Sequence, residues 1–288
     1  MGPTAFARLR PRSFLIARLV PIGGEWLMSG IANTLPASAR AVVLRSAADL
    51  ASRRPALVFR NPAKLAQGWA LQREEREHFI AFFGADLVVL PGRALVERMR
   101  AYGHFRTHEV RDADGKSAAE RHREAYGRDP PTLDFAPPEF AEVETVGVVY
   151  DEVDGLNFFA NFGLLQEVFA DPALAAKRAY RQAVLGYLDE PSIPPMALRR
   201  LAEPDPARAS RVFRRALREP SFSWARDGDA LLRRRKASYF AQPVLPSVTP
   251  FSERLARAQR SAPEAARDER PRPRAAARRR RSRTRRPR

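Results

Sequence analysis

The chain has 288 residues, a net charge of +18, 44% hydrophobic residues and no cysteine. A chain of this length and hydrophobic content can bury one core or two small ones, so it is not wholly disordered. The lack of cysteine excludes disulfides, thiolate metal sites, iron–sulfur clusters and a cysteine nucleophile. Because no apolar run approaches the ~20 residues that span a bilayer, we expect a cytoplasmic protein without a membrane role.

Arginine supplies most of the positive charge. Only four of the 51 basic residues are lysines, a skew that GC-rich codons produce without selection for binding. Residues 261–288 hold twelve arginines against three acidic residues. This segment therefore carries about half of the net charge in a tenth of the length.

The N-terminal residues predict a hairpin followed by a helix. Residues 14–20 and 25–29 have strand character and are separated by Gly23-Gly24. Apolar residues at three- and four-residue intervals over 36–54 predict an amphipathic helix. Because the chain enters a strand almost at once, two alternatives stay open: a complete N terminus, or a hairpin that has lost upstream partners.

Capping side chains followed by proline mark three helix starts, at Asn61-Pro62, Asp171-Pro172 and Asp205-Pro206. The first of these helices is predicted over 62–83, with Gly84 as its C-cap. A buried strand follows at 86–90, and a second helix follows at 93–102. Gly103 is expected to end that second helix.

A second hairpin, over 145–150 and 156–159, is predicted to close near Asp154-Gly155, a dipeptide preferred in tight turns. Residues 104–142 are polar and rich in proline, so they predict a long surface excursion. Beyond residue 162 the pattern predicts helices over 164–169, 172–188, 195–202, 206–218 and 228–238.

These elements predict an α+β fold. The two hairpins and the strand at 86–90 are expected to form one small, mainly antiparallel sheet covered by helices. We divide the chain into an α+β region at 13–162, a helical region at 163–258 that packs on it, and a disordered arginine-rich tail at 261–288.

Asp151, Glu152 and Asp154, at the second hairpin, are the strongest candidates for catalysis. Carboxylates at a strand end can bind magnesium or act as a general base. The cluster does not match an EF-hand, and a turn lined with solvated acids explains it equally well. We expect no measurable metal affinity at this turn and no cofactor.

His104 and His108 are four residues apart, a spacing that aligns two imidazoles on a helix. The glutamate of the zinc-protease motif is absent, and the expected helix end at Gly103 favours ordinary surface histidines. Glycine-rich phosphate loops and the G-x-S-x-G elbow are also missing from the sequence. The usual signatures of nucleotide-dependent enzymes and serine hydrolases are therefore absent.

Two sets of arginines are candidates for nucleic-acid binding. The first lies near Phe222 and Trp224, whose rings could stack on bases, and consists of Arg208, Arg211, Arg215 and Arg226. The second lies in the tail and consists of Arg278, Arg279, Arg280, Arg281, Arg283, Arg285 and Arg286. The tail could neutralise the phosphates of nucleic acid or the charges of another polyanion. The alternative is a product of codon bias or a frameshift, with no role.

Two segments carry a family resemblance: FRNPAKLAQGWALQREEREHFIAFFGADLVVLPG at 59–92 and YDEVDGLNFFANFGLLQEVFADP at 150–172. They resemble uncharacterised bacterial proteins that sometimes carry a SEC-C zinc motif, over about residues 13–255. The cysteines of that motif are absent here. The resemblance therefore implies neither a zinc ligand nor an activity.

Three functions remain open from the sequence. The first, narrowly favoured, is a non-catalytic interaction protein whose basic tail binds nucleic acid non-specifically. The second is a metal-dependent hydrolase that uses Asp151, Glu152 and Asp154, and the third is a partner-binding domain with a non-functional tail. A positive face that joins the four body arginines would favour the first function, whereas three converging carboxylates or histidines would favour the second.

Overall fold

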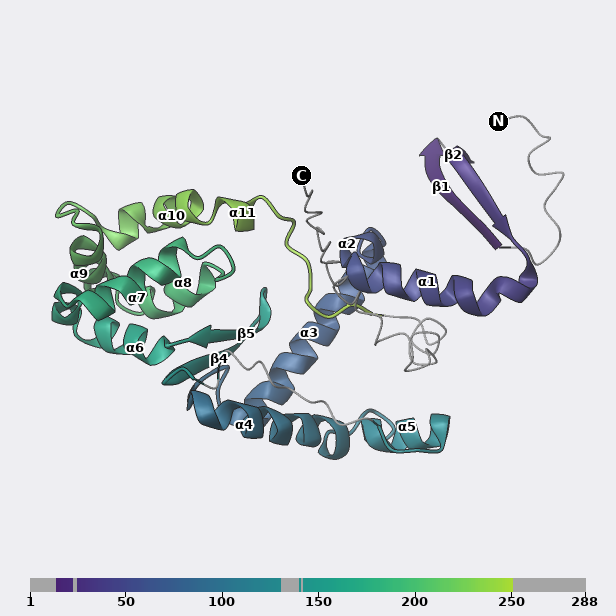
Figure 1. Ribbon diagram of the computed structural model, residues 1–288, viewed down its shortest axis with the longest axis horizontal. Helices are drawn as coiled ribbons and strands as arrows, with labels where there is room; N and C mark the ends of the chain where they lie inside the picture. The colour runs from purple at the N-terminus through teal and green to yellow at the C-terminus, as the bar shows by residue number, and fades with distance from the viewer. Residues whose placement is uncertain (1–13, 23–24, 131–139, 141, 251–288) are drawn as a thin grey trace, which may run out of the picture. The chain divides into compact units, whose positions relative to one another are not determined.

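The computed structural model describes residues 14–22, 25–130, 140 and 142–250 (Figure 1). The chain divides into two units, one made of 1–55 with 251–288 and the other of 56–250. The predicted tail at 261–288, with its seven candidate arginines, lies outside the described residues. The boundary predicted between 162 and 163 lies inside the second unit.

The first unit contains the predicted N-terminal hairpin and helix. Strands β1 (Phe14–Ile22) and β2 (Glu25–Leu35) pair antiparallel, followed by a 3-10 turn, η2 (Ala37–Ala39), and by α1 (Arg40–Arg53). The expectation that this hairpin shares a sheet with the second hairpin is wrong, because β1 and β2 form a two-stranded sheet of their own. Strands β1 and β2 pair with each other along nearly their whole length, whereas the second hairpin pairs with the strand that follows residue 86.

From residue 55 onward, the elements are α2 (Pro55–Val58), α3 (Pro62–Phe83), β3 (Leu87–Pro91), α4 (Gly92–His104), η3 (Phe105–Glu109), α5 (Ala118–Tyr126), β4 (Thr145–Asp151), β5 (Gly155–Ala160), α6 (Phe162–Ala170), η5 (Pro172–Ala176), α7 (Arg178–Asp189), α8 (Met196–Ala202), α9 (Pro206–Leu217), α10 (Trp224–Arg235) and α11 (Ala237–Phe240). The fold is a mostly helical α+β arrangement with small antiparallel sheets and a helical C-terminal part, as the sequence predicted. None of the helices described is long and apolar enough to cross a membrane.

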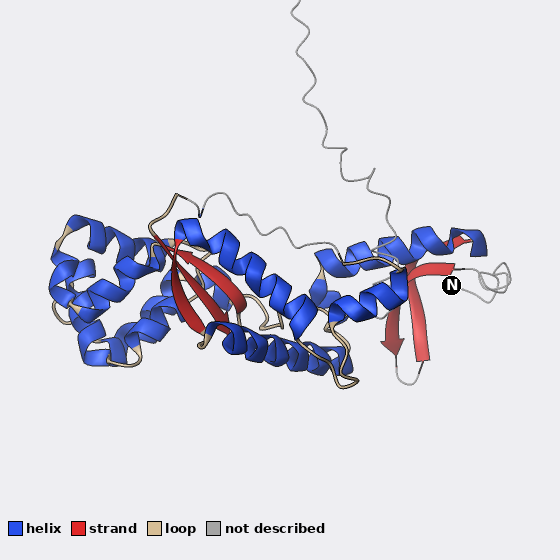
Figure 2. Ribbon diagram, turned by 90° about the horizontal axis from the view of Figure 1, so that it is seen from below, coloured by secondary structure: helices blue, strands red, loops and turns tan. Residues whose placement is uncertain are grey.

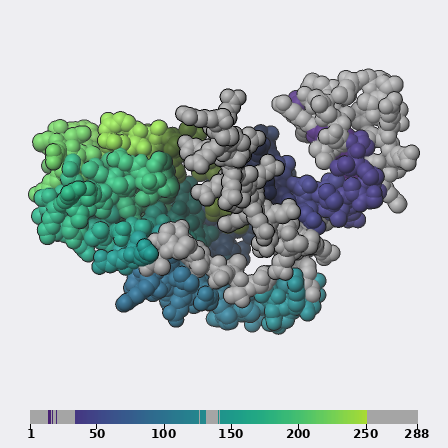
Figure 3. Space-filling model, in the orientation of Figure 1, coloured from purple at the N-terminus to yellow at the C-terminus, as the bar shows by residue number. Residues whose placement is uncertain are grey.

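The second unit is built around a three-stranded antiparallel sheet in the order β3-β4-β5 (Figure 2). Side chains alternate between the two faces of a strand, so β4 contributes to two cores. Val146 and Val148 pack in one core with residues of α3 and α4, and Val149 packs in the other with α6 to α10. The sheet is therefore the middle layer between two groups of helices. The helices of the second group form one continuous mass in the space-filling view (Figure 3).

Gly147 allows the sheet and α6 to approach closely. A Cβ atom at this position would lie 2.6 Å from the ring of Phe162, a distance that real Cβ atoms essentially never show. Phe162 is fully buried against this glycine at the start of α6. The start of α6 therefore packs directly against the backbone of β4.

The predicted caps of α3 and α9 are confirmed. Asn61 Oδ1 accepts a hydrogen bond from the Ala63 amide at 3.0 Å, and Gly84 ends α3 in the left-handed conformation. Asp205 Oδ1 accepts from the Arg208 amide at 2.8 Å. The helix predicted over 172–188 is wrong in part, because the chain forms the 3-10 turn η5 and then becomes extended at Lys177 before α7 begins.

One further prediction about the end of α4 is wrong. Gly103 does not end the helix: α4 runs to His104 and continues as the π-helical turn η3. A glycine inside a helix costs only about 1 kcal/mol, and the packing of this segment against α3 outweighs that cost. The predicted surface excursion contains α5, which begins with a capping box in which Ser117 and Glu120 bond to each other's backbone amides.

Candidate functional site

The three candidate acids lie at the turn between β4 and β5, where a three-residue loop joins the paired residues Asp151 and Gly155. Asp151 Oδ1 accepts hydrogen bonds from the amides of Val153 and Asp154 at 2.8 and 3.1 Å, which fixes the loop. Gly155 has a φ of +68°, a conformation that favours glycine and explains the Asp-Gly signal in the sequence. The turn is therefore held by Asp151 itself.

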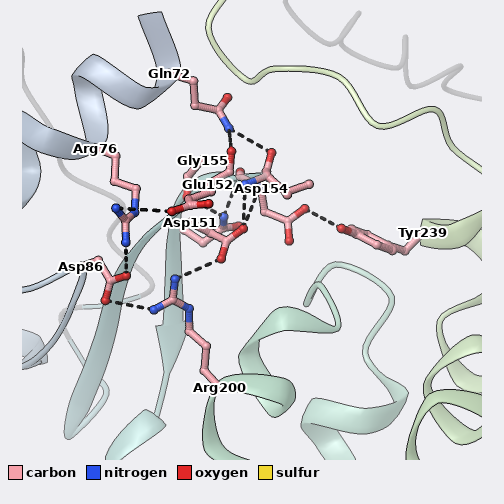
Figure 4. A network of polar contacts seen from close by, with 11 residues as sticks. Gln72, Arg76, Asp86, Asp151, Glu152, Asp154, Gly155, Arg200 and Tyr239 are labelled. Atoms are coloured by element: carbon pink, nitrogen blue, oxygen red, sulfur yellow. Dashed lines mark hydrogen bonds and ion pairs between the residues drawn. The ribbon is translucent and has the colours of Figure 1, made fainter. Parts of the chain in front are cut away.

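Arginines from two helices pair with the acids at this end of the sheet (Figure 4). Arg200 of α8 contacts Asp86 Oδ1 at 3.0 Å and Asp151 Oδ2 at 3.1 Å. Arg76 of α3 contacts Asp86 at 2.6 Å and Glu152 at 3.6 Å. Two arginines and three carboxylates thus join α3, the start of β3, the turn and α8.

These contacts determine how the carboxylates ionise. Burial alone would raise the pKa of Asp86, but the hydrogen bonds from Arg76 and Arg200 outweigh it and hold the pKa below its usual value. Burial likewise opposes ionisation of Asp151, but its two amide donors and Arg200 lower its pKa. Both groups are therefore stable anions in the folded protein.

Asp154 differs from its neighbours because, among the described residues, no arginine forms an ion pair with it, and Arg199 acts only through its charge. Burial raises the pKa of Asp154, and the negative charge of Asp151 adds to the shift, while a hydrogen bond from Tyr239 opposes it. The Tyr239 hydroxyl donates to Asp154 Oδ1 at 2.7 Å. This contact ties the turn to α11.

Gln72 holds the opposite side of the turn. It is fully buried, and its amide nitrogen donates to the carbonyls of Glu152 and Val153 at 2.8 and 3.0 Å. Its oxygen accepts from the amide and hydroxyl of Ser247, so the segment that follows α11 is fixed to the same turn. Every polar atom of the Gln72 side chain is therefore used in joining α3, the turn and this segment.

An open cleft of about 430 Å³ lies beside the turn. Its lining residues carry both signs of charge and come from α3, the turn, α8 and α11. The expectation that the acids are solvated holds for Glu152, whose side chain is 71% exposed, but is wrong for Asp151, which is 16% exposed and paired. Asp154 is half-buried and bonded to Tyr239. Within the described ranges no three histidine, aspartate or glutamate side chains are arranged to hold a metal ion.

The sequence contained a partial signal for this network. Gln72 and Arg76 fall on the same helical stripe as Phe79, so they are polar residues at positions that periodicity assigns to the core. Such residues need buried partners. The identity of those partners, Glu152 and Ser247 among them, depends on tertiary contacts over long sequence separations.

The four candidate arginines outside the tail, Arg208, Arg211, Arg215 and Arg226, fall into two classes. Arg208 contacts Asp205 at 3.2 Å, and Arg226 contacts Asp227 at 2.8 Å. Arg211 and Arg215 have no carboxylate within ion-pair distance among the residues that the structure describes. The predicted positive face therefore contains only two of the four residues as uncompensated charges.

Three further arginines join these two at the exposed side and C-terminal end of α9. We call Arg181, Arg211, Arg214, Arg215 and Arg218 the α9 arginine face. Three of them donate to backbone carbonyls: Arg181 to Ala216, Arg214 to Phe222 and Arg215 to Pro172, at 2.7 to 3.2 Å. Arg211 and Arg218 are exposed.

The fold explains why these arginines gather there. Residues 209, 212, 213 and 216 form the fully buried stripe of α9, so the arginines at 211, 215 and 218 lie on the opposite side. The Ala216 carbonyl lies in the last turn of α9, where carbonyls lack partners within the helix and attract cations such as Arg181. Each carbonyl bond uses one of the five N–H donors of a guanidinium and leaves its charge unneutralised.

The proposed stacking role of the nearby aromatic residues is wrong. Phe222 and Trp224 are 4% and 8% exposed, and Trp224 stacks on the buried Phe213 with ring centroids 4.8 Å apart. These rings belong to the core and cannot receive bases.

Comparisons of the chain with models of known protein families, with curated proteins and with solved structures found no match.

Proposed function

We propose that this chain is a non-catalytic protein that binds nucleic acid non-specifically, through the α9 arginine face and the arginine-rich segment at 261–288. The observation that carries the proposal is the class of arginines on α9, Arg211 and Arg215, that no carboxylate in the described part of the chain neutralises. Phosphate contacts dominate non-specific nucleic-acid binding, and they require cations that are exposed and uncompensated.

Two features of the α9 arginine face support phosphate binding. The carbonyl bonds of Arg181, Arg214 and Arg215 hold these long side chains in place, which reduces the entropy that binding must overcome. Arginine also presents paired donors that match phosphate oxygens. The aromatic rings nearby are buried, so the face offers backbone contacts without base stacking.

The geometry of the β4–β5 turn favours the hydrolase less. Asp151 already accepts two amide bonds and pairs with Arg200. Asp154 accepts from Tyr239, and only Glu152 projects largely into solvent. The network joins α3, the start of β3, the turn, α8, α11 and the segment after α11, which is the arrangement of a structural clamp.

The test is filter binding of duplex DNA at several salt concentrations, with two matched double variants. Arg211→Gln with Arg215→Gln removes two uncompensated charges, whereas Arg208→Gln with Arg226→Gln removes two charges that are paired with Asp205 and Asp227. The net charge of the protein changes by the same amount in the two double variants. We expect the first variant to make the slope of log affinity against log salt shallower by roughly 2, and the second to leave it nearly unchanged.

Truncation after residue 260 forms the second arm of the experiment. If about six of its arginines contact phosphates, the segment contributes a slope of roughly −5, and most of that is lost on truncation. Circular dichroism of each variant controls for folding. Equal losses in the two double variants would show that total charge and not the face determines binding, and an unchanged slope in every variant would overturn the proposal.

A further inference from the structure

A pair of histidines lies where α4 passes into η3. The ring centroids of His104 and His108 are 4.5 Å apart, and their planes differ by 23°. His104 is 65% exposed, and its Nδ1 atom lies 3.6 Å from Glu109 Oε1. One of the two sequence arguments against this pair is the expected helix end at Gly103, and the structure removes it.

The backbone that carries the pair is fixed by contacts that do not involve the histidines. Tyr102 is buried and packs edge-on against Phe79 of α3, and Phe105 packs against Phe82. Arg106 forms an ion pair with Glu75 of α3. The residues before and between the two imidazoles are therefore anchored, which fixes the backbone positions from which the two rings extend.

Residues four apart on a helix lie one above the other, so the two rings are neighbours, with His104 exposed and His108 half-buried. Single π-helical turns within helices occur frequently at functional sites. Here the turn begins directly after His104 and contains His108.

The ring separation fits two imidazoles on one metal ion. With metal–nitrogen bonds of about 2.1 Å, the two ring centroids lie roughly 4.5 to 5.5 Å apart for bond angles between a right angle and the tetrahedral value. The observed 4.5 Å falls at the lower end of that range. The rings are nearly parallel and must rotate to direct their nitrogens at the ion, which is a change in the soft χ2 torsion of histidine.

We propose that His104 and His108 form a binding site for a divalent first-row transition metal ion, and that this ion is zinc. Imidazole nitrogen suits zinc, copper and nickel, whereas magnesium and calcium prefer oxygen ligands. The two imidazoles occupy two positions on the ion, and water fills the others. Glu109 is placed to accept from Nδ1 of His104 and to orient its other nitrogen toward the metal, a role that carboxylates have beside many zinc ligands.

This site is separate from the β4–β5 turn and from the α9 arginine face. Two protein ligands make it weaker than the four-ligand sites of zinc fingers, so zinc is not required for folding. The chain has four histidines and no cysteine, which makes the ligand assignment simple to test.

The experiment is calorimetric titration of the full chain with zinc chloride near neutral pH. Wild type is expected to show one saturable site, and His104→Ala and His108→Ala are each expected to weaken it at least about tenfold. His122→Ala is the matched control, because its ring on α5 contacts the Arg128 carbonyl instead, and it should bind zinc as wild type does. Glu109→Gln should weaken binding by a smaller factor than loss of either histidine.

Both histidine variants replace side chains outside the two cores, so circular dichroism should show unchanged folding. The absence of saturable zinc binding by wild type would overturn the proposal. Wild-type affinity in either His104→Ala or His108→Ala would overturn it as well, because the ion would then have other ligands.

Discussion

Replacement of Arg200 by methionine tests whether the β4–β5 network is a structural clamp. Arg200 contacts Asp86 and Asp151 at 3.0 and 3.1 Å, and the three side chains are only 16% to 26% exposed. Removing one partner from a buried ion pair costs about 3 to 5 kcal/mol, because the remaining charge is left uncompensated. Asp86 keeps its contact with Arg76 and Asp151 keeps two amide donors, so we expect a smaller loss of about 2 to 3 kcal/mol.

The adjacent arginine provides the control. Arg199→Met removes the same charge from the same helix, but its partner Asp229 is 75% exposed. An exposed pair contributes about 0 to 1 kcal/mol, so this variant should unfold at nearly the wild-type urea concentration. Urea denaturation followed by circular dichroism gives both values.

The dependence on pH provides a second measurement of the same effect. Despite burial, arginine contacts hold the pKa of Asp86 below its ordinary value, and two amide donors together with Arg200 do the same for Asp151. The contribution of both groups to stability is therefore present at neutral pH and is lost as the pH falls through those lowered values. The difference in unfolding free energy between wild type and Arg200→Met should therefore be largest near about pH 7 and shrink toward about pH 3. Equal destabilisation by Arg199→Met and Arg200→Met, or a difference that does not depend on pH, would refute the clamp.

Three other substitutions test the helices α9, α3 and α4. Asp205→Ala removes the acceptor for an amide in the first turn of α9, at 2.8 Å, and should lower the free energy of unfolding by about 0.5 to 2 kcal/mol; an unchanged denaturation midpoint would contradict this cap. Gly68→Ala would place a Cβ atom 2.7 Å from Pro246, so it should destabilise the fold by about 1 to 3 kcal/mol. In Gly103→Ala the added Cβ atom meets no atom within 4 Å, so this variant should stabilise α4 by up to about 1 kcal/mol. Similar effects of Gly68→Ala and Gly103→Ala in thermal denaturation would argue against close packing at Gly68.

The helix and strand assignments that succeeded depend on local chemistry. Asn61 and Asp205 cap helices because a side-chain oxygen three bonds from Cα reaches the first-turn amides whatever the rest of the fold is. The apolar run of β3 and the Asp-Gly turn also express short-range preferences. The α+β class follows from the order of such elements.

The predictions that were wrong have a common cause. In each of them, the local free-energy difference between the alternative conformations is small. The continuation of α4 through Gly103 and the break at Lys177 each involve about a kilocalorie per mole of backbone preference, and packing against neighbouring helices exceeds it. The pairing partners of the two hairpins likewise depend on surfaces brought together from distant parts of the chain.

For the candidate sites, too, some features were readable in the sequence and others depended on tertiary contacts. The sequence by itself placed acids at the β4–β5 turn, arginines along α9 and two histidines four residues apart, because side-chain type and spacing are visible in a string of residues. Only the tertiary structure decided which charges are neutralised: it paired Asp151 with Arg200, from 49 positions away, and left Arg211 and Arg215 without a carboxylate among the described residues. Electrostatic interactions weaken with distance in space and not along the chain, so the state of a charged group is fixed by the fold that surrounds it.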